Sequence, residues 1–352
     1  MTKLRRFSLT AYQTPLCETI VDCPEPAGSE VLVRVERCGV CHSDLHMQDG
    51  YFALGDGKTL DVREGRTLPF TLGHEIAGVI EHAGPDAGSA KPGAKIAVYP
   101  WIGCGACAAC RAGEENLCSN NRHLGISADG GFASHVLVPH PRYLIHYAPL
   151  SPSFAGALMC SGLTAYSALK HLQAHAARGP VLLVGLGGVG MMGLAIARAL
   201  FAEPPIVVDI DAGKREAALK AGATAAYDPA DREARRAIIK ATAGGTFAAC
   251  DFVGSESSLA FATGALAKGG KAVVTGLLGG NFPLPVTMLV LKAITVQGTL
   301  TGTLQEANEL MALARAGKVA PLPIDERPIA AAQQSLDDLR AGRVVGRVSL
   351  VT

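Results

Sequence analysis

Hydrophobic and polar residues alternate along much of the first 150 residues, and this pattern predicts short strands rather than helices. Residues 30–40, EVLVRVERCGV, alternate as a half-buried strand does. Proline and glycine bound similar apolar runs in HEIAGVIEHAG, KPGAKIAVYP and GFASHVLVP. Because helical periodicity is almost absent here, we expect a β-rich N-terminal domain.

The pattern changes after Pro152, where apolar residues recur at helical spacing in SFAGALMCSGLTAYSALKHL. A buried strand then runs into a helix in VLLVGLGGVGMMGLAIARAL. Strand-like PIVVDID, helical AGKREAALKAG, and strand-like ACDFVG, GKAVVTGL and AITVQGTL follow. Alternating strands and helices predict an α/β fold, with a parallel sheet covered by helices on both faces. A helix in LQEANELMALARAG begins a final piece that we expect to pack on the N-terminal domain.

Size and charge narrow the class of protein. The 352 residues are enough for two domains, and a net charge of +1 with interspersed signs favours neither nucleic acid nor an anionic membrane. The N-terminus lacks the apolar run of a signal peptide, and no apolar run is long enough to span a membrane. We therefore expect a cytoplasmic protein that acts on a small molecule.

Four cysteines crowd into one short segment: Cys104, Cys107, Cys110 and Cys118. Four thiolates can surround one tetrahedral Zn²⁺ and leave no position open for substrate, which indicates a structural zinc. An iron–sulfur cluster or free thiols are the alternatives. A zinc-ribbon nucleic-acid module is disfavoured, because Arg111 is the only basic residue in the segment and two glutamates outweigh it.

A glycine-rich turn follows the first predicted strand of the α/β part. Gly185, Gly187 and Gly190 form G-x-G-x-x-G at the start of a helix, where backbone N–H groups can bind a pyrophosphate. Asp209 lies nineteen residues beyond Gly190, at the end of the next strand. A carboxylate there accepts hydrogen bonds from ribose hydroxyls and repels a 2′-phosphate, which favours NAD over NADP.

Three scattered residues are candidates for a second metal site: Cys41, His74 and Cys160. Two thiolates and an imidazole suit a catalytic zinc with one open position. No spacing rule joins residues so far apart, and a cysteine on an apolar helix is as readily a core residue.

The motifs CHSDLH, GHE, the four-cysteine segment, CSGLTAY and GLGGVG…VVDID occur in this order. With them the chain resembles, over its whole length, the zinc-dependent alcohol dehydrogenases of the medium-chain dehydrogenase/reductase family. The resemblance implies a β-rich GroES-like catalytic domain with a structural-zinc lobe over residues 1–160. It further implies a Rossmann domain with a doubly wound parallel sheet over 161–301, and a segment 302–352 that returns to the catalytic domain. The implied cofactors are NAD and two Zn²⁺ per chain.

The resemblance also assigns catalytic roles. Cys41, His74 and Cys160 would hold the catalytic zinc, Glu75 would take part in ligand exchange, and Asp44 would orient His74. Ser43 would bond the substrate hydroxyl and pass its proton, through the nicotinamide ribose, to His46 and solvent. A surface histidine without a role is the alternative for His46.

Coenzyme contacts are implied at a larger set of positions. His42 and Arg347 would face the pyrophosphate, with Arg343 as the rival of Arg347. Thr164 and Val189 would flank the nicotinamide, and Lys214 would lie by the adenosine ribose. The full set is His42, Thr164, Gly185, Gly187, Gly188, Val189, Gly190, Asp209, Lys214 and Arg347.

Substrate identity is less determined. Ser43 is smaller than the threonine of ethanol-type relatives, which favours secondary, cyclic or benzylic alcohols. Tyr51, Phe52, Tyr99 and Trp101 are pocket-wall candidates or core residues. A polar loop near residues 53–67 is longer than in yeast-type relatives and would border the entrance.

Other functions remain open as alternatives. The chain would be a primary-alcohol dehydrogenase or, more remotely, a noncatalytic NAD- and zinc-binding protein. Cys160 and the intact cysteine segment argue against a polyol dehydrogenase. Relatives of this size imply a homotetramer, with the ITVQGTL region in the dimer contact.

Overall fold

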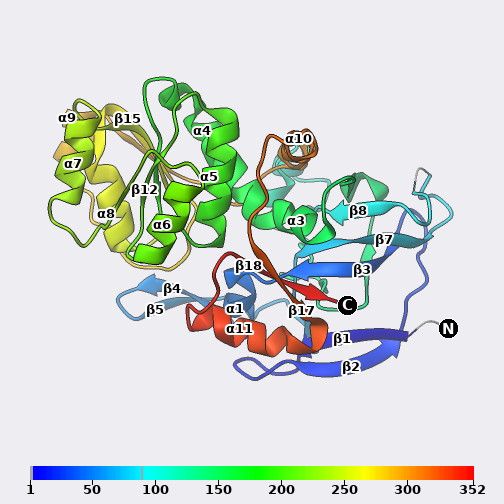
Figure 1. Cartoon of the computed structure of the whole chain (residues 1–352). Coiled ribbons are helices and arrows are strands. Elements are labelled where there is room, and N and C mark those ends of the chain that lie inside the picture. Colours follow the sequence, from blue (N-terminus) through cyan, green and yellow to red (C-terminus); the bar gives the residue numbers. More distant parts are fainter. Residues whose placement is uncertain (1–2, 89) are drawn as a thin grey trace.

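The computed structural model describes residues 3–88 and 90–352. A β-rich part and an α/β part lie side by side, with helices from the middle of the chain between them (Figure 1). Both expectations from the hydrophobic pattern, a β-rich N-terminal part and an α/β part after Pro152, are confirmed.

A seven-stranded sheet organises the β-rich part, in the order β10-β8-β7-β3-β18-β17 with β9 also paired to β3. Its strands are β3 (Val31–Gly39), β7 (Glu75–Ala83), β8 (Lys95–Val98), β9 (His135–Val138), β10 (Leu144–His146), β17 (Ile324–Pro328) and β18 (Arg347–Val351). A second sheet joins β2 (Cys17–Asp22), β1 (Lys3–Leu9) and β6 (Phe70–Thr71). The β18 strand pairs antiparallel with β3, with Leu350 opposite Cys38, so residues near both ends of the described chain share one sheet.

The α/β part is built on six parallel strands in the order β13-β12-β11-β14-β15-β16. Their bounds are β11 (Leu182–Val184), β12 (Ile206–Val208), β13 (Ala225–Tyr227), β14 (Thr246–Asp251), β15 (Leu266–Val274) and β16 (Thr295–Gly298). The central strands are buried on both faces and therefore consist of apolar runs such as LLV and IVV. In Figure 1, α4 and α5 lie on one side of β12, and α7 and α8 lie on the other.

Helices connect these strands and join the two parts. They are α3 (Pro152–Ala157), α4 (Leu163–Ala176), α5 (Gly188–Leu200), α6 (Ala212–Lys220), α7 (Ala234–Ala241), α8 (Glu256–Gly264), α9 (Val286–Lys292), α10 (Leu304–Arg315) and α11 (Ala332–Arg340). One apolar core runs from Val33 in β3, through Leu158 and Leu163, to Leu183 in β11. The two parts are therefore packed through a shared core rather than joined by a linker.

Two elements differ from the sequence expectations. The segment His42–Asp49 forms helix α1, which the pattern missed because its buried side chains, Asp44, Leu45, Met47 and Gln48, make no apolar stripe. The loop expected near residues 53–67 is wrong in part, because β4 (Tyr51–Gly55) and β5 (Lys58–Asp61) form a hairpin.

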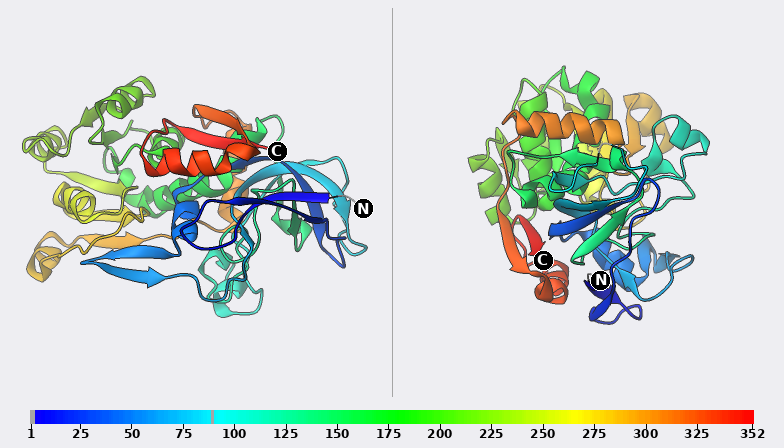
Figure 2. Two further views of the ribbon diagram at one scale, coloured as in Figure 1. Left: turned by 90° about the horizontal axis from the view of Figure 1, so that it is seen from below. Right: turned by 90° about the vertical axis from the view of Figure 1, so that its right-hand side faces the viewer.

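This hairpin reaches the α/β part. Asp56, at its turn, accepts a hydrogen bond from the side-chain amide of Asn281. Figure 2 shows the hairpin extending from the β-rich part along the neighbouring strands of the α/β part. The extra residues therefore bridge the two parts of the chain.

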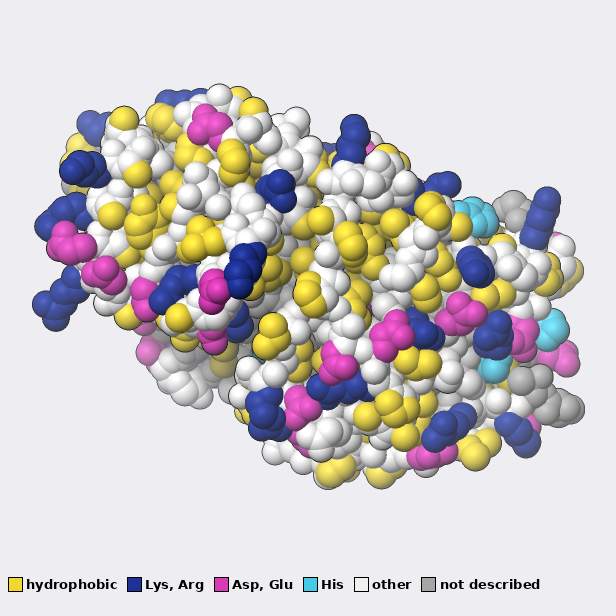
Figure 3. Space-filling view, viewed as in Figure 1, with side chains coloured by type: hydrophobic (Ala, Val, Ile, Leu, Met, Phe, Trp, Pro, Cys, Tyr) yellow, Lys and Arg dark blue, Asp and Glu magenta, His cyan; other side chains and the backbone are white. Residues whose placement is uncertain are grey.

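Charged side chains of both signs are interspersed over the face in Figure 3, so no single-sign field covers it. Over residues 3–88 and 90–352, no helix combines the length and apolar character needed to cross a membrane.

Candidate active site and metal centres

Three predicted metal ligands meet where the two parts of the chain join. Cys41 is the N-cap of α1, His74 precedes β7, and Cys160 lies in a π-helical turn, Leu158–Gly162, between α3 and α4. All three side chains are buried, and one ligand atom from each lies within 4.8 Å of the others. The π turn interrupts the helix expected from residue 152 onward, as such turns often do at functional sites.

The donor set fits zinc. The Cys41 and Cys160 sulfurs are 3.9 Å apart, close to the ~3.8 Å separation of two thiolates on a tetrahedral zinc with 2.3 Å bonds. Nδ1 of His74 lies 3.3 Å from Asp44 Oδ1, and neither ring nitrogen of this buried imidazole has a hydrogen-bond partner among the described residues. A buried imidazole nitrogen without a partner is costly, and a metal ion at this point would satisfy it.

Asp44 fixes this arrangement. Its carboxylate accepts hydrogen bonds from the backbone N–H of Cys41, at 2.9 Å, and of Gly73, at 3.1 Å. The same carboxylate therefore caps the N-terminus of α1, binds the backbone of the residue before His74 and faces the imidazole ring. A carboxylate behind a ligand histidine sets its ring orientation, which agrees with the predicted role of Asp44.

A hydrogen bond joins the two buried thiols of this cluster, with the sulfurs 3.9 Å apart. The hydrogen bond with Cys160, in which either sulfur can donate, lowers the pKa of Cys41 well below its usual value, and His74 acts in the same direction. The same hydrogen bond, together with burial, raises the pKa of Cys160. The site is therefore already disposed to hold a thiolate, the form that binds zinc.

Glu75 and Arg347 form a buried ion pair beside this cluster. Burial raises the pKa of Glu75 to about 7, and the Arg347 guanidinium opposes that rise. A β-carbon built on Gly188 would lie 2.8 Å from Nη1 of Arg347, so the guanidinium also contacts the start of α5. Arg347 thus connects the metal cluster to the glycine turn, and its role toward a pyrophosphate stays a prediction. Arg343, its rival, is bound to Asp338 at 2.6 Å.

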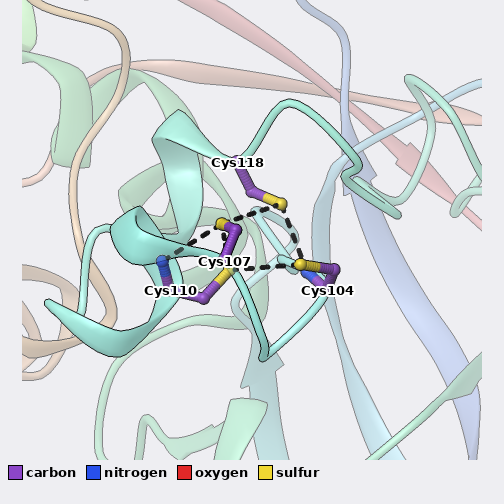
Figure 4. Close-up of side chains that lie close together, drawn as sticks. All are labelled: Cys104, Cys107, Cys110 and Cys118. Carbon is purple, nitrogen blue, oxygen red and sulfur yellow. Dashed lines mark hydrogen bonds between the residues drawn. The ribbon is translucent and has the colours of Figure 1, made fainter.

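The four-cysteine segment forms a second thiol cluster, in which the side chains point toward one another (Figure 4). Neighbouring sulfurs are 3.5–3.9 Å apart, the separations that four thiolates around one zinc require. Backbone N–H groups of Ala106 and Cys107 lower the pKa of Cys104 to about 6, which favours the metal-binding thiolate. The geometry fits a closed structural site, as the spacing indicates.

Two residues that the sequence did not single out tie this lobe to the rest of the chain. The buried Glu115 carboxylate accepts hydrogen bonds from the Gly103 N–H and the Tyr143 hydroxyl. The Asn116 side chain donates to the carbonyl of Leu300, where the chain leaves the α/β part. The only sequence signal that points to Glu115 is its place between the ligand cysteines Cys110 and Cys118.

The glycine turn has the geometry of a dinucleotide site. Gly185 has φ +91°, which L side chains rarely adopt, and a β-carbon on Gly190 would lie 1.8 Å from the Gly185 carbonyl oxygen. Gly187 faces open space, where any side chain would project into the room that a pyrophosphate needs. Asp209 accepts a 2.6 Å hydrogen bond from Leu186 N–H, so its carboxylate lies beside the turn.

The other predicted residues lie around these two features. Ser43 Oγ is 3.9 Å from the Cys41 sulfur, and the His46 ring packs on Phe52 with centroids 4.5 Å apart. Exposed or partly exposed positions hold His42 in α1, Thr164 in α4, Val189 in α5 and Lys214 in α6. The positive charge of Lys214 lowers the pKa of His42, so these two side chains lie within reach of each other's charge.

The pocket-wall candidates separate into different environments. Trp101 packs on the His74 ring with centroids 5.5 Å apart and donates from Nε1 to the Met159 carbonyl. Tyr99 is fully buried and donates to the Gly302 carbonyl, which makes it a core residue. Tyr51 and Phe52 begin the β4–β5 hairpin.

A glycine turn on a parallel sheet, facing a buried thiol–imidazole cluster, defines a metal-containing dinucleotide-dependent dehydrogenase. Comparisons with known proteins agree. Residues 27–149 match the alcohol dehydrogenase GroES-like domain, and residues 188–316 match the zinc-binding dehydrogenase domain. The chain belongs to the zinc-dependent alcohol dehydrogenases of the medium-chain dehydrogenase/reductase family, and it is an oxidoreductase.

Individual relatives share the whole length of the chain. An NAD-dependent alcohol dehydrogenase of Sulfurisphaera tokodaii is 37% identical, over 99% of this chain and 100% of the relative. A D-arabinose 1-dehydrogenase (NADP(+)) of Saccharolobus solfataricus is 31% identical, over 99% of this chain and 97% of the relative. The solved structure of the alcohol dehydrogenase from Aeropyrum pernix superposes with a TM-score of 0.88 at 30% identity. The superposition covers 99% of this chain and 100% of the other chain.

Proposed function

We propose that the protein is a zinc- and NAD-dependent alcohol dehydrogenase that interconverts secondary, cyclic or benzylic alcohols with ketones or aldehydes. The observation that carries this proposal is the buried cluster of Cys41, His74 and Cys160, joined through Glu75 and Arg347 to the glycine turn. A metal held by three side chains keeps one position for substrate, next to where the coenzyme would lie.

Zinc bound at this cluster supplies Lewis-acid polarisation that makes an alcohol hydroxyl more acidic. Ser43, beside Cys41, accepts a hydrogen bond from that hydroxyl and orients it. His46 returns the proton to solvent, since its ring is partly exposed and imidazole exchanges protons near neutral pH. Thr164 and Val189 would contact the nicotinamide ring and hold it in place.

Asp209 supports the choice of NAD. Its carboxylate lies beside the glycine turn, where a 2′-phosphate would meet a negative charge. Lys214 lies nearby and bonds the adenosine ribose. A relative named for NADP(+) use makes the coenzyme a necessary part of the first assay.

Activity with two matched alcohols tests the proposed function. With NAD⁺, kcat/KM for 2-butanol should exceed that for 1-butanol, because Ser43 leaves room beside the reacting carbon. NADP⁺ should support little turnover, and a zinc chelator should abolish turnover with NAD⁺. Preference for 1-butanol would make the enzyme a primary-alcohol dehydrogenase. Absence of turnover with both alcohols, despite bound zinc and NAD⁺, would favour a noncatalytic NAD- and zinc-binding protein.

Coenzyme affinity should depend on pH through His42. Partial desolvation, followed by the charges of Arg347 and Lys214, lowers the pKa of His42 below its ordinary 6.5, against the opposing influence of Cys41. The protonated ring attracts the pyrophosphate, so NADH affinity should fall as pH rises through that lowered pKa, and should be flat above pH 7. Fluorescence titrations with NADH from pH 5 to 8 measure this, and His42→Gln should remove the dependence. A flat profile for the wild type would contradict the role of His42.

We further propose two zinc ions per chain, a homotetramer and a cytoplasmic location. Helix α9, which precedes the edge strand β16 in the chain, carries exposed apolar side chains, including Val286, Val290 and Leu291, and these support self-association. The ten cysteines form no disulfide, which suits a reducing compartment.

A further inference from the structure

His123 carries a buried nitrogen that nothing in the described chain satisfies. Its side chain is 5% exposed, and Nε2 has no hydrogen-bond partner within the described residues. Buried polar atoms are nearly always bonded, so an unpartnered one is open to a hydrogen bond from a bound molecule. His123 has no part in holding either thiol cluster.

Backbone pairing brings His123 to the metal centre. Arg122 N–H donates to the Ile102 carbonyl and Leu124 N–H donates to the Pro100 carbonyl, which places His123 directly opposite Trp101. The two rings meet edge to face, with centroids 5.4 Å apart and planes at 82°. Trp101 in turn packs on His74, so one indole contacts both the metal-ligand ring and the His123 ring.

The side chain of Trp101 has no polar group left to hydrogen-bond a ligand. Its single N–H already donates to the Met159 carbonyl at 3.0 Å. Of the polar side-chain atoms of Trp101 and His123, Nε2 of His123 is therefore the one that is buried without a partner in the described residues, one indole ring away from the metal ligand His74.

The His123 ring is uncharged near neutral pH. Burial lowers the pKa of His123 to about 4, although the Glu115 carbonyl, as a hydrogen-bond acceptor, raises it. Because Nε2 has no partner in the described residues, we assign the proton of the neutral ring to Nδ1, on the side of the Glu115 backbone. Nε2 then carries a lone pair, and its complement is a hydroxyl that donates.

We propose that His123 is a specificity-determining residue whose Nε2 accepts a hydrogen bond from a second hydroxyl group of the substrate. This inference rests on the proposed function and names the substrate class more closely: alcohols with a further hydroxyl near the reacting carbon. Such a substrate satisfies Nε2, whereas a simple alcohol of the same length leaves it unpaired.

The test compares 2,3-butanediol with 2-butanol, two substrates with the same carbon chain. His123→Phe keeps an aromatic ring against Trp101 and removes both nitrogens. The ratio of kcat/KM for the diol to that for the mono-alcohol should fall about fivefold, the effect of one lost hydrogen bond. His123→Gln, whose amide oxygen accepts, should retain more of the ratio. An unchanged ratio in His123→Phe would overturn the proposal.

Matched controls separate this outcome from general damage. His171→Phe removes an exposed imidazole from α4 and should leave the ratio unchanged. An unchanged zinc content in His123→Phe shows that this variant keeps both metal sites. Calorimetric titration of the zinc-loaded wild type without coenzyme measures binding alone, and the diol should bind about fivefold more tightly than 2-butanol. Equal or weaker diol binding would also overturn the proposal. A wild type that binds the diol but oxidises neither alcohol would contradict the proposed function instead.

Discussion

Replacing Cys160 with serine should lower kcat/KM for 2-butanol about 1000-fold or more and remove one zinc per chain. The Cys160 sulfur lies 3.9 Å from that of Cys41, and the thiol pair with His74 forms the cluster that fits a catalytic zinc. A serine hydroxyl is a poor zinc ligand at neutral pH. Loss of Lewis-acid assistance worth several kcal/mol corresponds to at least three factors of ten in rate.

Atomic absorption and steady-state kinetics on the same preparation measure both effects. Cys17→Ser is the control, because Cys17 is exposed in β2 and belongs to neither thiol cluster. Circular dichroism reports whether the Cys160→Ser chain keeps its fold. Full activity and an unchanged zinc content in this variant would rule out the assigned site.

Removing one cysteine of the structural cluster should destabilise the protein more than it changes the chemistry. In Cys110→Ser the lobe would lose a ligand whose sulfur lies 3.5 Å from Cys107 and 3.9 Å from Cys104. Structural zinc contributes directly to folding free energy, so we expect a thermal midpoint roughly 5–10 °C lower and one zinc fewer per chain. The remaining folded fraction should retain kcat within about threefold, because the cluster offers no position for substrate.

Differential scanning calorimetry with zinc analysis gives both quantities. Cys23→Ser, outside both thiol clusters, is the matched control. A chelator titration adds a second readout, since the lobe zinc should leave with a drop in the midpoint. If Cys110→Ser keeps the wild-type midpoint and zinc content, the lobe holds no structural zinc.

Local signals predicted much of the fold and part of the candidate site. The six parallel strands follow from apolar runs separated by helical segments, and the lobe follows from four cysteines whose spacing lets thiols converge. Gly185 and Gly190 were predictable because the turn requires a positive φ at one and close packing at the other. Cys160 was ambiguous by pattern alone, since periodicity cannot tell a buried ligand from a core thiol, and only the resemblance favoured it.

The remaining features depend on contacts between distant segments. Helix α1 has no apolar stripe, because Asp44 and Gln48 point inward to bond Gly73 and Gln333. The β4–β5 hairpin is formed largely by polar residues, which are equally compatible with a loop. Asn281 of the α/β part donates a hydrogen bond to Asp56 at its turn. His123 gives no sequence signal, because only its pairing opposite Trp101 brings it to the metal centre.

The pairing of β18 with β3 also sets an order of events during synthesis on the ribosome. All six strands of the coenzyme sheet precede β18 in the chain, so they can fold while β18 is still untranslated. Until then the middle of the other sheet has an open edge at β3, and Glu75 has no Arg347 beside it. A nascent chain therefore acquires its nucleotide-binding half first and completes its metal-binding half only after β18 emerges from the exit tunnel.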